Sequence, residues 1–509
     1  MNKKLTTLII MDGFGVPEDQ ERSGIIDTNT KNIRDLKETY SYATLRASEE
    51  YVGLPAGQAG TSEVGHMTIG SGRVTYQPLV KINKEIENKK FFNNETLNWA
   101  IDQAKKENKG LHLIGMPSDG GIHSHIDHLF ALLDLCKQKE MKNVYIHFIC
   151  DGRDTPPKST KKYIKQVEDY IKKVGVGKLA TIIGRFYALD RDKNWDRNKI
   201  AYDAWVDGVG TLAKSWEEAV DNAYANGETD EFIKPIILTR CGKPITKIKE
   251  GDCVISYNFR ADRERQLAYV MVEDNDLDFV KPLNLKFVTM TEYDENFKKV
   301  YVAYKTESAN NLLSEVLSNN GLRQVKIAET EKYAHLTFFF NSGKQDTFEK
   351  EDRILINSEK MASYANKPEM SAEQITAQAL KVIEEDKYDF IAINFANCDM
   401  VGHSGNRDAA RKATEVVDKC VKQVVDAVVK KGGQGIITAD HGNADIMQYE
   451  DGSPNTAHTT AIVPFILFDS KEPKKNLRKE GTLADIAPTL LKMLDIEIPA
   501  EMTGKPMFE

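Results

Sequence analysis

The sequence has no long apolar run, no paired cysteines and no excess of basic residues. No stretch of its 509 residues approaches the 18 or more consecutive apolar residues of a membrane-spanning helix. The six cysteines are scattered without a C-x-x-C pair, which argues against a disulfide framework and favours a reducing cytoplasm. Asp and Glu (77) outnumber Lys and Arg (69), and the net charge of −8 disfavours a nucleic-acid partner. We therefore expect a cytoplasmic protein that binds neither a membrane nor nucleic acid.

What is present is the composition of a globular protein, with strands and helices alternating along the chain. Apolar residues make up 41% and charged residues 29%, which argues against disorder. Amphipathic helical stretches include residues 371–385, where Ser371 and Gln374 form a capping-box pattern. Between such helices lie short apolar runs at residues 5–11, 111–115, 144–150, 180–183, 390–395 and 435–438. This alternation predicts an α/β fold with largely parallel sheets.

Two segments have the composition of linkers. A Gly-rich stretch leads into residues 73–78, and residues 303–307 precede a helical run that starts near Asn310. If both are linkers, residues 1–76 and 307–509 form one discontinuous domain, and residues 77–306 form a second domain inserted into it. Spacing alone does not decide this division.

Three of the predicted strands are followed by residues that can bind metal ions. These residues are Asp12, Asp399, His403, Asp440 and His441. Because ligands of open α/β sheets bind beyond the carboxyl ends of the strands, these side chains can converge. Carboxylate and imidazole groups without a thiolate suit Mn, Fe or Zn. A single Asp after a strand commonly caps a turn, but three such strand ends favour a metal centre, which His458 can complete.

The Gly-rich segment 57–67 places Ser62 before a helical turn. A hydroxyl in this position can simply be the N-cap of the helix. Beside a metal centre it can instead be a nucleophile, because a metal lowers the pKa of a bound hydroxyl. No Gly-Lys pair is followed by Ser or Thr, so there is no Walker motif to favour nucleotide binding.

Cationic side chains follow three further predicted strands. They are Arg153, Arg185, Arg191, Arg260 and Arg263, with Asp154 beside the first of them. The planar guanidinium matches phosphate and carboxylate, so the pattern favours an anion pocket, although a salt-bridged surface fits any single arginine equally well.

The histidines divide into two kinds. His112 and His147 lie inside apolar strands and are expected to be satisfied core residues. His123, His125 and His128 follow two glycines, and their spacing is compatible with a metal cluster or with phosphate recognition.

Taken together and in order, these segments closely resemble the cofactor-independent (2,3-bisphosphoglycerate-independent) phosphoglycerate mutases of the alkaline phosphatase superfamily. The resemblance covers essentially the whole chain and shows no departure at a catalytic position. The segments that carry it are residues 12–15, the Ser62 loop, and residues 151–155, 258–263, 328–333, 399–403 and 438–443. It implies an alkaline-phosphatase-like α/β domain formed by the two chain ends, and an inserted α/β transferase domain that binds substrate.

The resemblance also implies an activity and the residues that perform it. The activity is the interconversion of 3-phosphoglycerate and 2-phosphoglycerate in glycolysis and gluconeogenesis, through a phosphoserine on Ser62 and without 2,3-bisphosphoglycerate. One Mn ion is expected on Asp399, His403 and His458, and a second on Asp12, Ser62, Asp440 and His441. The catalytic residues are expected to be Ser62, Asp154 and Lys332. The substrate-binding residues are expected to be His123, Arg153, Asp154, Arg185, Arg191, Arg260, Arg263 and Lys332. Members of the family are typically monomeric and cytoplasmic.

A metal-dependent phosphomonoester hydrolase of the same superfamily is the main alternative. It would share the metal centre but would have no need to retain glycerate, and its product would be inorganic phosphate. A non-catalytic metal-binding protein would lack the nucleophile or a ligand, and this sequence has all of them.

Overall fold

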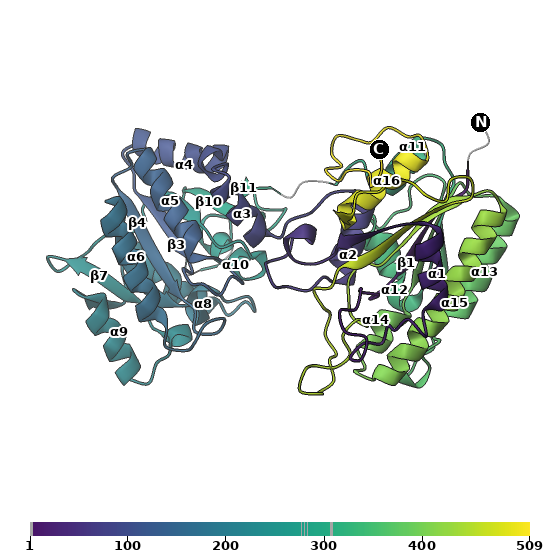
Figure 1. The fold of residues 1–509 in the computed structure, drawn as a ribbon. Helices are drawn as coiled ribbons and strands as arrows, with labels where there is room; N and C mark the ends of the chain where they lie inside the picture. The colour runs from purple at the N-terminus through teal and green to yellow at the C-terminus, as the bar shows by residue number, and fades with distance from the viewer. Residues whose placement is uncertain (1–3, 276, 279, 282, 306–308) are drawn as a thin grey trace. The chain divides into compact units, whose positions relative to one another are not determined.

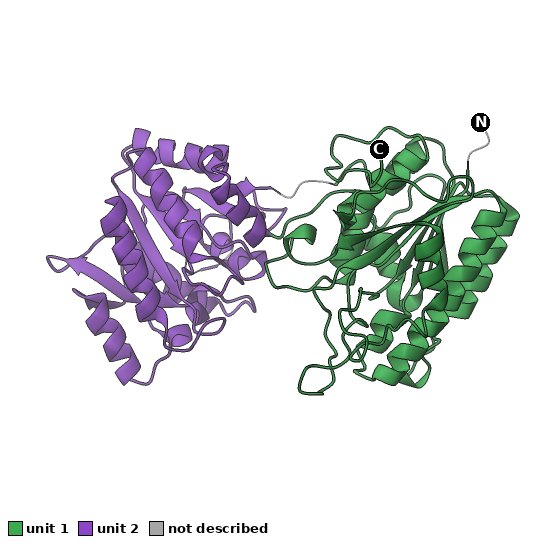
Figure 2. Ribbon diagram, viewed as in Figure 1, with its two compact units in different colours: residues 1–77, 308–509 green, residues 78–307 purple. Residues whose placement is uncertain are grey.

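The computed structural model describes residues 4–275, 277–278, 280–281, 283–305 and 309–509. The chain divides into two compact units, unit 1 with residues 1–77 and 308–509, and unit 2 with residues 78–307 (Figure 2). The first boundary between the units lies between residues 77 and 78, one residue from the expected boundary between 76 and 77. The expected boundary between 306 and 307 falls outside the described residues. Each unit contains its own mainly parallel sheet flanked by helices, so the predicted α/β class is confirmed.

The central strands of unit 1 are apolar and buried along their whole length, which is typical of parallel strands covered on both faces. β1 (Thr6–Met11) lies between β14 (Phe390–Phe395) and β15 (Gln434–Thr438) and runs parallel to both. The strand order is β13-β12-β14-β1-β15-β16-β2-β17. The other strands are β2 (Ser41–Arg46), β12 (Gln324–Glu329), β13 (Glu351–Ile356), β16 (Val463–Asp469) and β17 (Glu480–Thr482).

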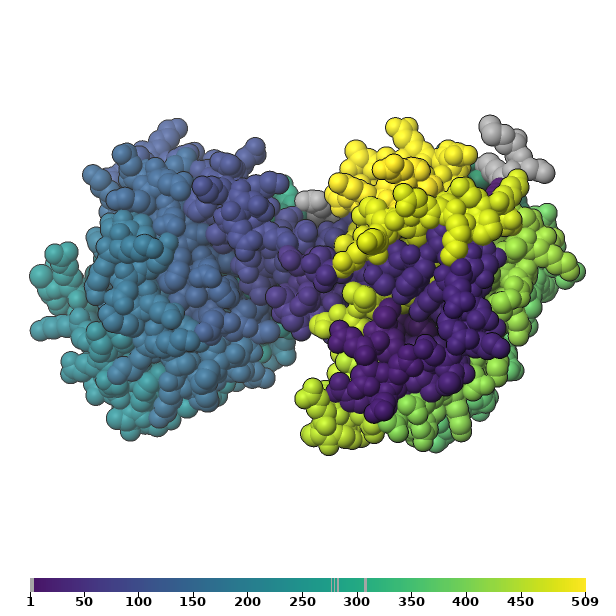
Figure 3. Space-filling view, in the orientation of Figure 1, coloured from purple at the N-terminus to yellow at the C-terminus, as the bar shows by residue number. Residues whose placement is uncertain are grey.

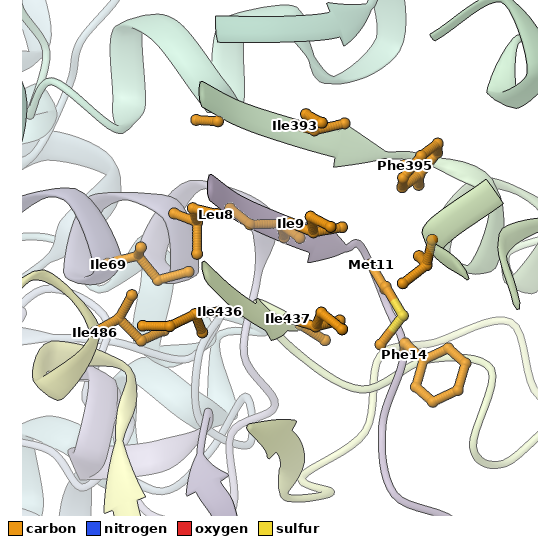
Figure 4. Packing of buried hydrophobic residues seen from close by; sticks show 14 of the residues in the cluster. Leu8, Ile9, Met11, Phe14, Ile69, Ile393, Phe395, Ile436, Ile437 and Ile486 are labelled. Atoms are coloured by element: carbon orange, nitrogen blue, oxygen red, sulfur yellow. The ribbon is translucent and has the colours of Figure 1, made fainter. Parts of the chain in front are cut away.

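Successive side chains of β1 point to opposite faces of this sheet, and each face is covered by helices. Leu8 and Ile436 pack with Ile69 of α2 (Ser62–Ser71) and Ile486 of α16 (Ile486–Met493), as Figure 4 shows. Helices on the opposite side include α1 (Lys31–Thr39), α13 (Ala372–Glu385) and α15 (Arg407–Lys430) (Figure 1). α11 (Leu313–Asn319) packs near α2.

Both ends of the chain contribute to unit 1. β2 pairs with β17 and with β16, so segments about 430 residues apart in sequence share one sheet. Figure 3 shows the purple N-terminal and yellow C-terminal segments side by side on this unit. The two chain ends therefore build a single core.

Unit 2 has a second sheet with the strand order β11-β10-β9-β3-β4-β5-β7-β6, and β8 pairs with β7. Its strands are β3 (Leu111–Gly115), β4 (Val144–Cys150), β5 (Lys178–Gly184), β6 (Thr211–Ala213), β7 (Ile236–Arg240), β8 (Lys243–Pro244), β9 (Cys253–Ser256), β10 (Lys286–Thr291) and β11 (Val300–Tyr304). Its helices are α3 (Pro78–Glu87), α4 (Glu95–Lys106), α5 (Ile126–Gln138), α6 (Thr160–Val174), α7 (Arg185–Ala188), α8 (Trp195–Tyr202), α9 (Trp216–Ala225) and α10 (Ala261–Met271). The pairs are parallel except where β7 meets β5 and β8.

Three predicted strands, 111–115, 144–150 and 390–395, have the observed bounds, and the others differ by one or two residues at their ends. The predicted capping box at Ser371 is wrong. The Ser371 hydroxyl donates to the Asn357 carbonyl, and α13 begins at Ala372 without a side-chain cap. Among the described residues, no helix combines the length and apolarity needed to span a membrane.

Candidate active site

The carboxyl ends of three neighbouring strands in unit 1 bring distant residues together. Asp12 follows β1, Asp399 lies in α14 (Asn397–Gly402) directly after β14, and Asp440 and His441 follow β15. Because β1 lies between the other two strands and runs parallel to both, these side chains occur at one edge of the sheet. All four are buried.

The hydroxyl of Ser62 lies within this group of side chains. Ser62 is the first residue of α2, and the N-cap is Thr61, whose hydroxyl accepts from the Val64 amide. The Ser62 Oγ lies 2.9 Å from His441 Nε2 and 3.2 Å from Asp12 Oδ1. The N-cap that this segment could provide is therefore Thr61, and the Ser62 hydroxyl is left to the site.

Close backbone contact allows these elements to meet. A Cβ atom on Gly65 of α2 would lie 2.6 Å from the Asp440 carbonyl oxygen. A Cβ atom on Gly13 would lie 2.7 Å from the Asp399 Cα, and Gly13 also has a φ of +74°. Only glycine fits at either position, so α2 and the three strand ends approach more closely than side chains would permit.

We expect Gly65→Ala to lower the free energy of unfolding by about 1–3 kcal/mol, because the added methyl group would push α2 away from Asp440. The displacement would also move the Ser62 hydroxyl, so activity should fall by more than the lost stability explains. Urea denaturation and a turnover assay on the same preparation measure the two effects. An unchanged unfolding midpoint would contradict the close packing.

The histidines of this site are oriented by backbone carbonyls. The Nδ1 atoms of His403 and His458 lie 2.8 Å from the carbonyls of Thr456 and Gly60, and His441 Nδ1 lies 3.2 Å from its neighbour's carbonyl. A proton on Nδ1 leaves Nε2 to face the carboxylates, and this is the arrangement seen in metal-binding histidines. The His458 Nε2 lies 3.0 Å from Asp399 Oδ1, and the His403 Nε2 lies 3.2 Å from the same oxygen.

Lys332 is the positively charged residue that contacts the carboxylates of the site. It lies in α12 (Thr330–Ala334). Its buried Nζ lies 2.7 Å from Asp12 Oδ1, 2.6 Å from Asp399 Oδ2 and 2.6 Å from the Ser62 Oγ. Burial opposes the ammonium charge, but the surrounding carboxylates outweigh it and raise the pKa of Lys332 above its ordinary value. Burial likewise opposes the charges of Asp12 and Asp399, yet Lys332 holds the pKa of each well below its usual range.

The carboxylates also act on the imidazoles. Burial opposes the charge on His441, but Asp440 and Asp12 raise its pKa to about 10. A hydrogen bond to Asp399 raises the pKa of His403. The His441 ring therefore favours the protonated state when only protein groups surround it, and a metal ion would have to displace that proton.

The donor set fits divalent cations. Ligand atoms of Asp399, His441 and His458 lie within 4.8 Å of one another, as do those of Asp12, His66 and Asp440. The Asp440 Oδ2 is buried and accepts no hydrogen bond from the described residues. His66 Nδ1 lies 3.1 Å from that oxygen, but its hydrogen bond goes to the Ser62 carbonyl, 2.9 Å away. A buried carboxylate oxygen without a donor is suited to a metal ion.

Unit 2 gathers a second set of the predicted residues around Arg185. The Arg185 Nη1 donates to Asp151 at 2.8 Å and to Asp154 at 2.6 Å, and its Nη2 lies 2.9 Å from His123 Nε2. Because a guanidinium can only donate, His123 Nε2 must accept. Burial and the charge of Arg185 lower the pKa of His123 to about 4, so this imidazole is neutral at physiological pH.

The remaining arginines lie near this group. Arg191 Nη1 and Arg260 Nε donate to the two oxygens of Asp262, at 2.9 and 3.1 Å. Burial and the charges of Arg185 and Arg191 lower the pKa of Arg263, which is the sign of crowded positive charge. A cavity of about 250 Å³ is lined in part by Arg153, Arg185 and Arg263. Crowded guanidinium groups beside a cavity are suited to an anion.

The expected alternative of a three-histidine metal cluster is wrong. His125 Nδ1 caps α5, His128 Nε2 lies 2.8 Å from Asn83 Oδ1, and His123 lies against Arg185. The pair His112 and His147 are core residues as expected, with their ring nitrogens 2.9 Å apart.

Asp151 also belongs to this cluster, although no role was predicted for it from the sequence. It accepts from Arg185 and from the backbone amides of Arg153 and Asp154, at 3.3 and 3.0 Å. Its place directly after β4 could have suggested such a role. His66 and Asn394 were not predicted, because Asn394 occurs alone within an apolar strand and no local pattern indicates that His66 of α2 lies beside it.

Glu264 of α10 lies directly after Arg263 in the chain, and burial raises its pKa to about 7. In the unfolded chain this carboxyl has its ordinary pKa near 4.5 and loses its proton at lower pH. Between these two values stability should therefore decrease as pH rises, by up to about 3 kcal/mol in total. We expect Glu264→Gln, which cannot titrate, to lose less stability over this range. Urea unfolding of the wild type and of Glu264→Gln at pH 5 and pH 8 measures this difference. An equal loss of stability in the two proteins between these pH values would contradict the prediction.

Comparison with known proteins identifies the family of the chain. Residues 82–295 match the family described as BPG-independent PGAM N-terminus, and residues 285–489 match the family described as type I phosphodiesterase / nucleotide pyrophosphatase. The chain is 49% identical to the 2,3-bisphosphoglycerate-independent phosphoglycerate mutase of Clostridium tetani and 50% identical to that of Clostridium kluyveri, with 100% of each chain covered.

A solved structure also shares this fold. The crystal structure of Leishmania mexicana phosphoglycerate mutase at low cobalt concentration is 27% identical, with a TM-score of 0.54 over 99% of this chain and 98% of that one. Identity near one half along the full length of two curated relatives establishes the family. The chain is thus an enzyme that belongs to the 2,3-bisphosphoglycerate-independent phosphoglycerate mutases, within the alkaline phosphatase superfamily.

Proposed function

We propose that the chain interconverts 3-phosphoglycerate and 2-phosphoglycerate through a phosphoserine on Ser62, with two Mn ions bound beside it. The observation that carries this proposal is the set of contacts of the Ser62 hydroxyl with Lys332, His441 and Asp12. A buried hydroxyl that touches a cation and two potential metal ligands supports a role as a nucleophile more than a purely structural one.

The residues divide into two metal sites. Asp399, His403 and His458 would hold one ion, and Asp12, Ser62, Asp440 and His441 would hold the other. When bound, such ions lower the pKa of a hydroxyl and neutralise the charge of a phosphoryl group. Mn suits this mixture of carboxylate and imidazole ligands.

The protein groups then have separate tasks. The Ser62 hydroxyl loses its proton to solvent before the reaction. Its ionised Oγ then attacks phosphorus in line, forming an O–P bond as the bond from phosphorus to the 3-hydroxyl oxygen breaks, and the same ionised oxygen is released in the second step. Lys332 donates to the transferring group and neutralises developing charge. Asp154 gives a proton to the departing 3-hydroxyl and takes one from the 2-hydroxyl, which then attacks the phosphoserine. The arginines of unit 2 and neutral His123 bind glycerate and keep it from leaving between the two steps.

The deciding experiment is a mutase assay without 2,3-bisphosphoglycerate, on protein freed of metal and then titrated with Mn. We expect activity only after Mn is added, with 2-phosphoglycerate as the product. Inorganic phosphate as the main product would favour the phosphomonoester hydrolase. The monomeric state, the cytoplasmic location and the separate domain roles remain predictions.

Retention of glycerate predicts a specific effect of Arg260→Lys, which keeps the charge but loses the planar guanidinium. We expect weaker binding of glycerate and a larger share of free glycerate and inorganic phosphate among the products. Arg240→Lys, at the exposed end of β7, is the matched control. Product analysis by NMR measures the partition. If Arg260→Lys and the control have the same turnover and partition, Arg260 does not hold glycerate.

A further inference from the structure

A buried chain of polar side chains connects three of the elements that meet at Ser62. His66 lies on α2, four residues after Ser62, and Asn394 lies on β14, and both are fully buried. The Asn394 Nδ2 is 2.9 Å from Asp12 Oδ2 and 3.0 Å from His66 Nε2. The His66 Nδ1 is 2.9 Å from the Ser62 carbonyl oxygen and 3.1 Å from Asp440 Oδ2.

The direction of each hydrogen bond follows from the chemistry of its partner. The ionised carboxylate of Asp12 can only accept, so the amide nitrogen of Asn394 must face it. That nitrogen can only donate, so His66 Nε2 accepts its second hydrogen. The proton of a neutral His66 is therefore on Nδ1, where it faces the Ser62 carbonyl and the Asp440 carboxylate.

This tautomer argues against a role for His66 as a metal ligand, although its ring lies close to Asp12 and Asp440. Binding a metal through Nδ1 would remove the proton that faces the Ser62 carbonyl oxygen and leave that oxygen without this donor. It would also place the remaining ring proton on Nε2, against the amide hydrogens of Asn394. Both nitrogens are better used as hydrogen-bond partners of the groups that bind the ion.

We propose that His66 and Asn394 are positioning residues that fix Asp12 and Ser62, two of the four groups assigned to one metal ion. The inference rests on the proposed dinuclear function. It predicts an effect on one metal site and not on the other, because neither residue is hydrogen-bonded to Asp399, His403 or His458. Their loss should weaken the site that contains Ser62 and leave the other site unchanged.

The test is a Mn titration of the full chain, followed by the electron paramagnetic resonance of free Mn, with His458→Ala used to identify the other site. We expect His66→Phe to weaken Mn binding at the Ser62 site by about 10–100-fold. Losses of this size are typical when a residue that is hydrogen-bonded to a metal ligand is removed. Asn394→Leu should have the same selective effect and provides a second test where His66→Phe does not fold. Circular dichroism of the metal-free variants checks the fold.

The decisive variant is His66→Asn. Its amide nitrogen takes the place of Nδ1 and can donate to the Ser62 carbonyl, so it should restore most of the lost affinity. His335→Phe removes another imidazole of unit 1 and is the matched control. Equal weakening of both sites, no weakening of either, or a loss in His66→Asn as large as in His66→Phe would overturn the positioning role. Wild-type protein that binds fewer than two Mn ions would overturn the proposed function and this inference together.

Discussion

Ser62→Ala is expected to lower mutase turnover by about 10⁴-fold or more, because the variant has no group to accept the phosphoryl. Among the described residues the Ser62 hydroxyl has only side-chain partners, and Thr61 caps the helix, so the fold should survive. Acid-quenched protein incubated with phosphate-labelled 3-phosphoglycerate should carry label in the wild type and none in the variant.

Ser71→Ala is the matched control, because it removes a hydroxyl from the other end of α2 that donates only to the Arg73 carbonyl. We expect this control to keep its activity and its covalent label. Substantial turnover by metal-loaded Ser62→Ala protein, or label on that protein, would contradict the phosphoserine scheme.

Lys332→Met is expected to have the largest effect on stability. It leaves Asp12 and Asp399 buried and facing each other without the ammonium group between them. Removing one partner of a buried ion pair costs about 3–5 kcal/mol, and we expect this loss in metal-free protein. Added Mn should restore part of it, because ions that bind only the folded state stabilise it and also neutralise the carboxylates.

Lys326→Met is a closely matched control. Lys326 is a buried lysine of β12 in the same unit, 3.1 Å from Glu351 Oε1 and without contact to the Ser62 site. Both variants should be less stable than the wild type in urea, but only Lys332→Met should be rescued by Mn and only it should lose turnover. Equal rescue of both variants, or rescue of neither, would show that Lys332 does not compensate charge at a metal site.

Much of the fold and of the site could be predicted because it depends on local patterns. The runs at residues 390–395 and 435–438 are apolar except for Asn394 and Thr438, since parallel strands are covered on both faces, and the polar residues that follow the runs lie at the strand ends. The same rule predicted that Asp12, Asp399 and His441 can meet. The arginines after strands of unit 2 were predicted in the same way.

Other features depend on contacts that no local pattern contains. From the sequence alone, the hydroxyl in the Ser62 segment could be a helix cap or a nucleophile. The structure shows that Thr61 caps α2 and that Lys332, 270 residues away in the chain, contacts Ser62. No local pattern connects His66 with Asn394, and their side chains meet only in the folded chain, where Asn394 Nδ2 lies 3.0 Å from His66 Nε2. Backbone periodicity is set by neighbours in the chain, so sequence alone determined the strands, the helices and the residues at their ends. Hydrogen bonds and charge coupling depend on atoms that meet only after the chain ends fold together, so tertiary structure decided which of those residues act as one site.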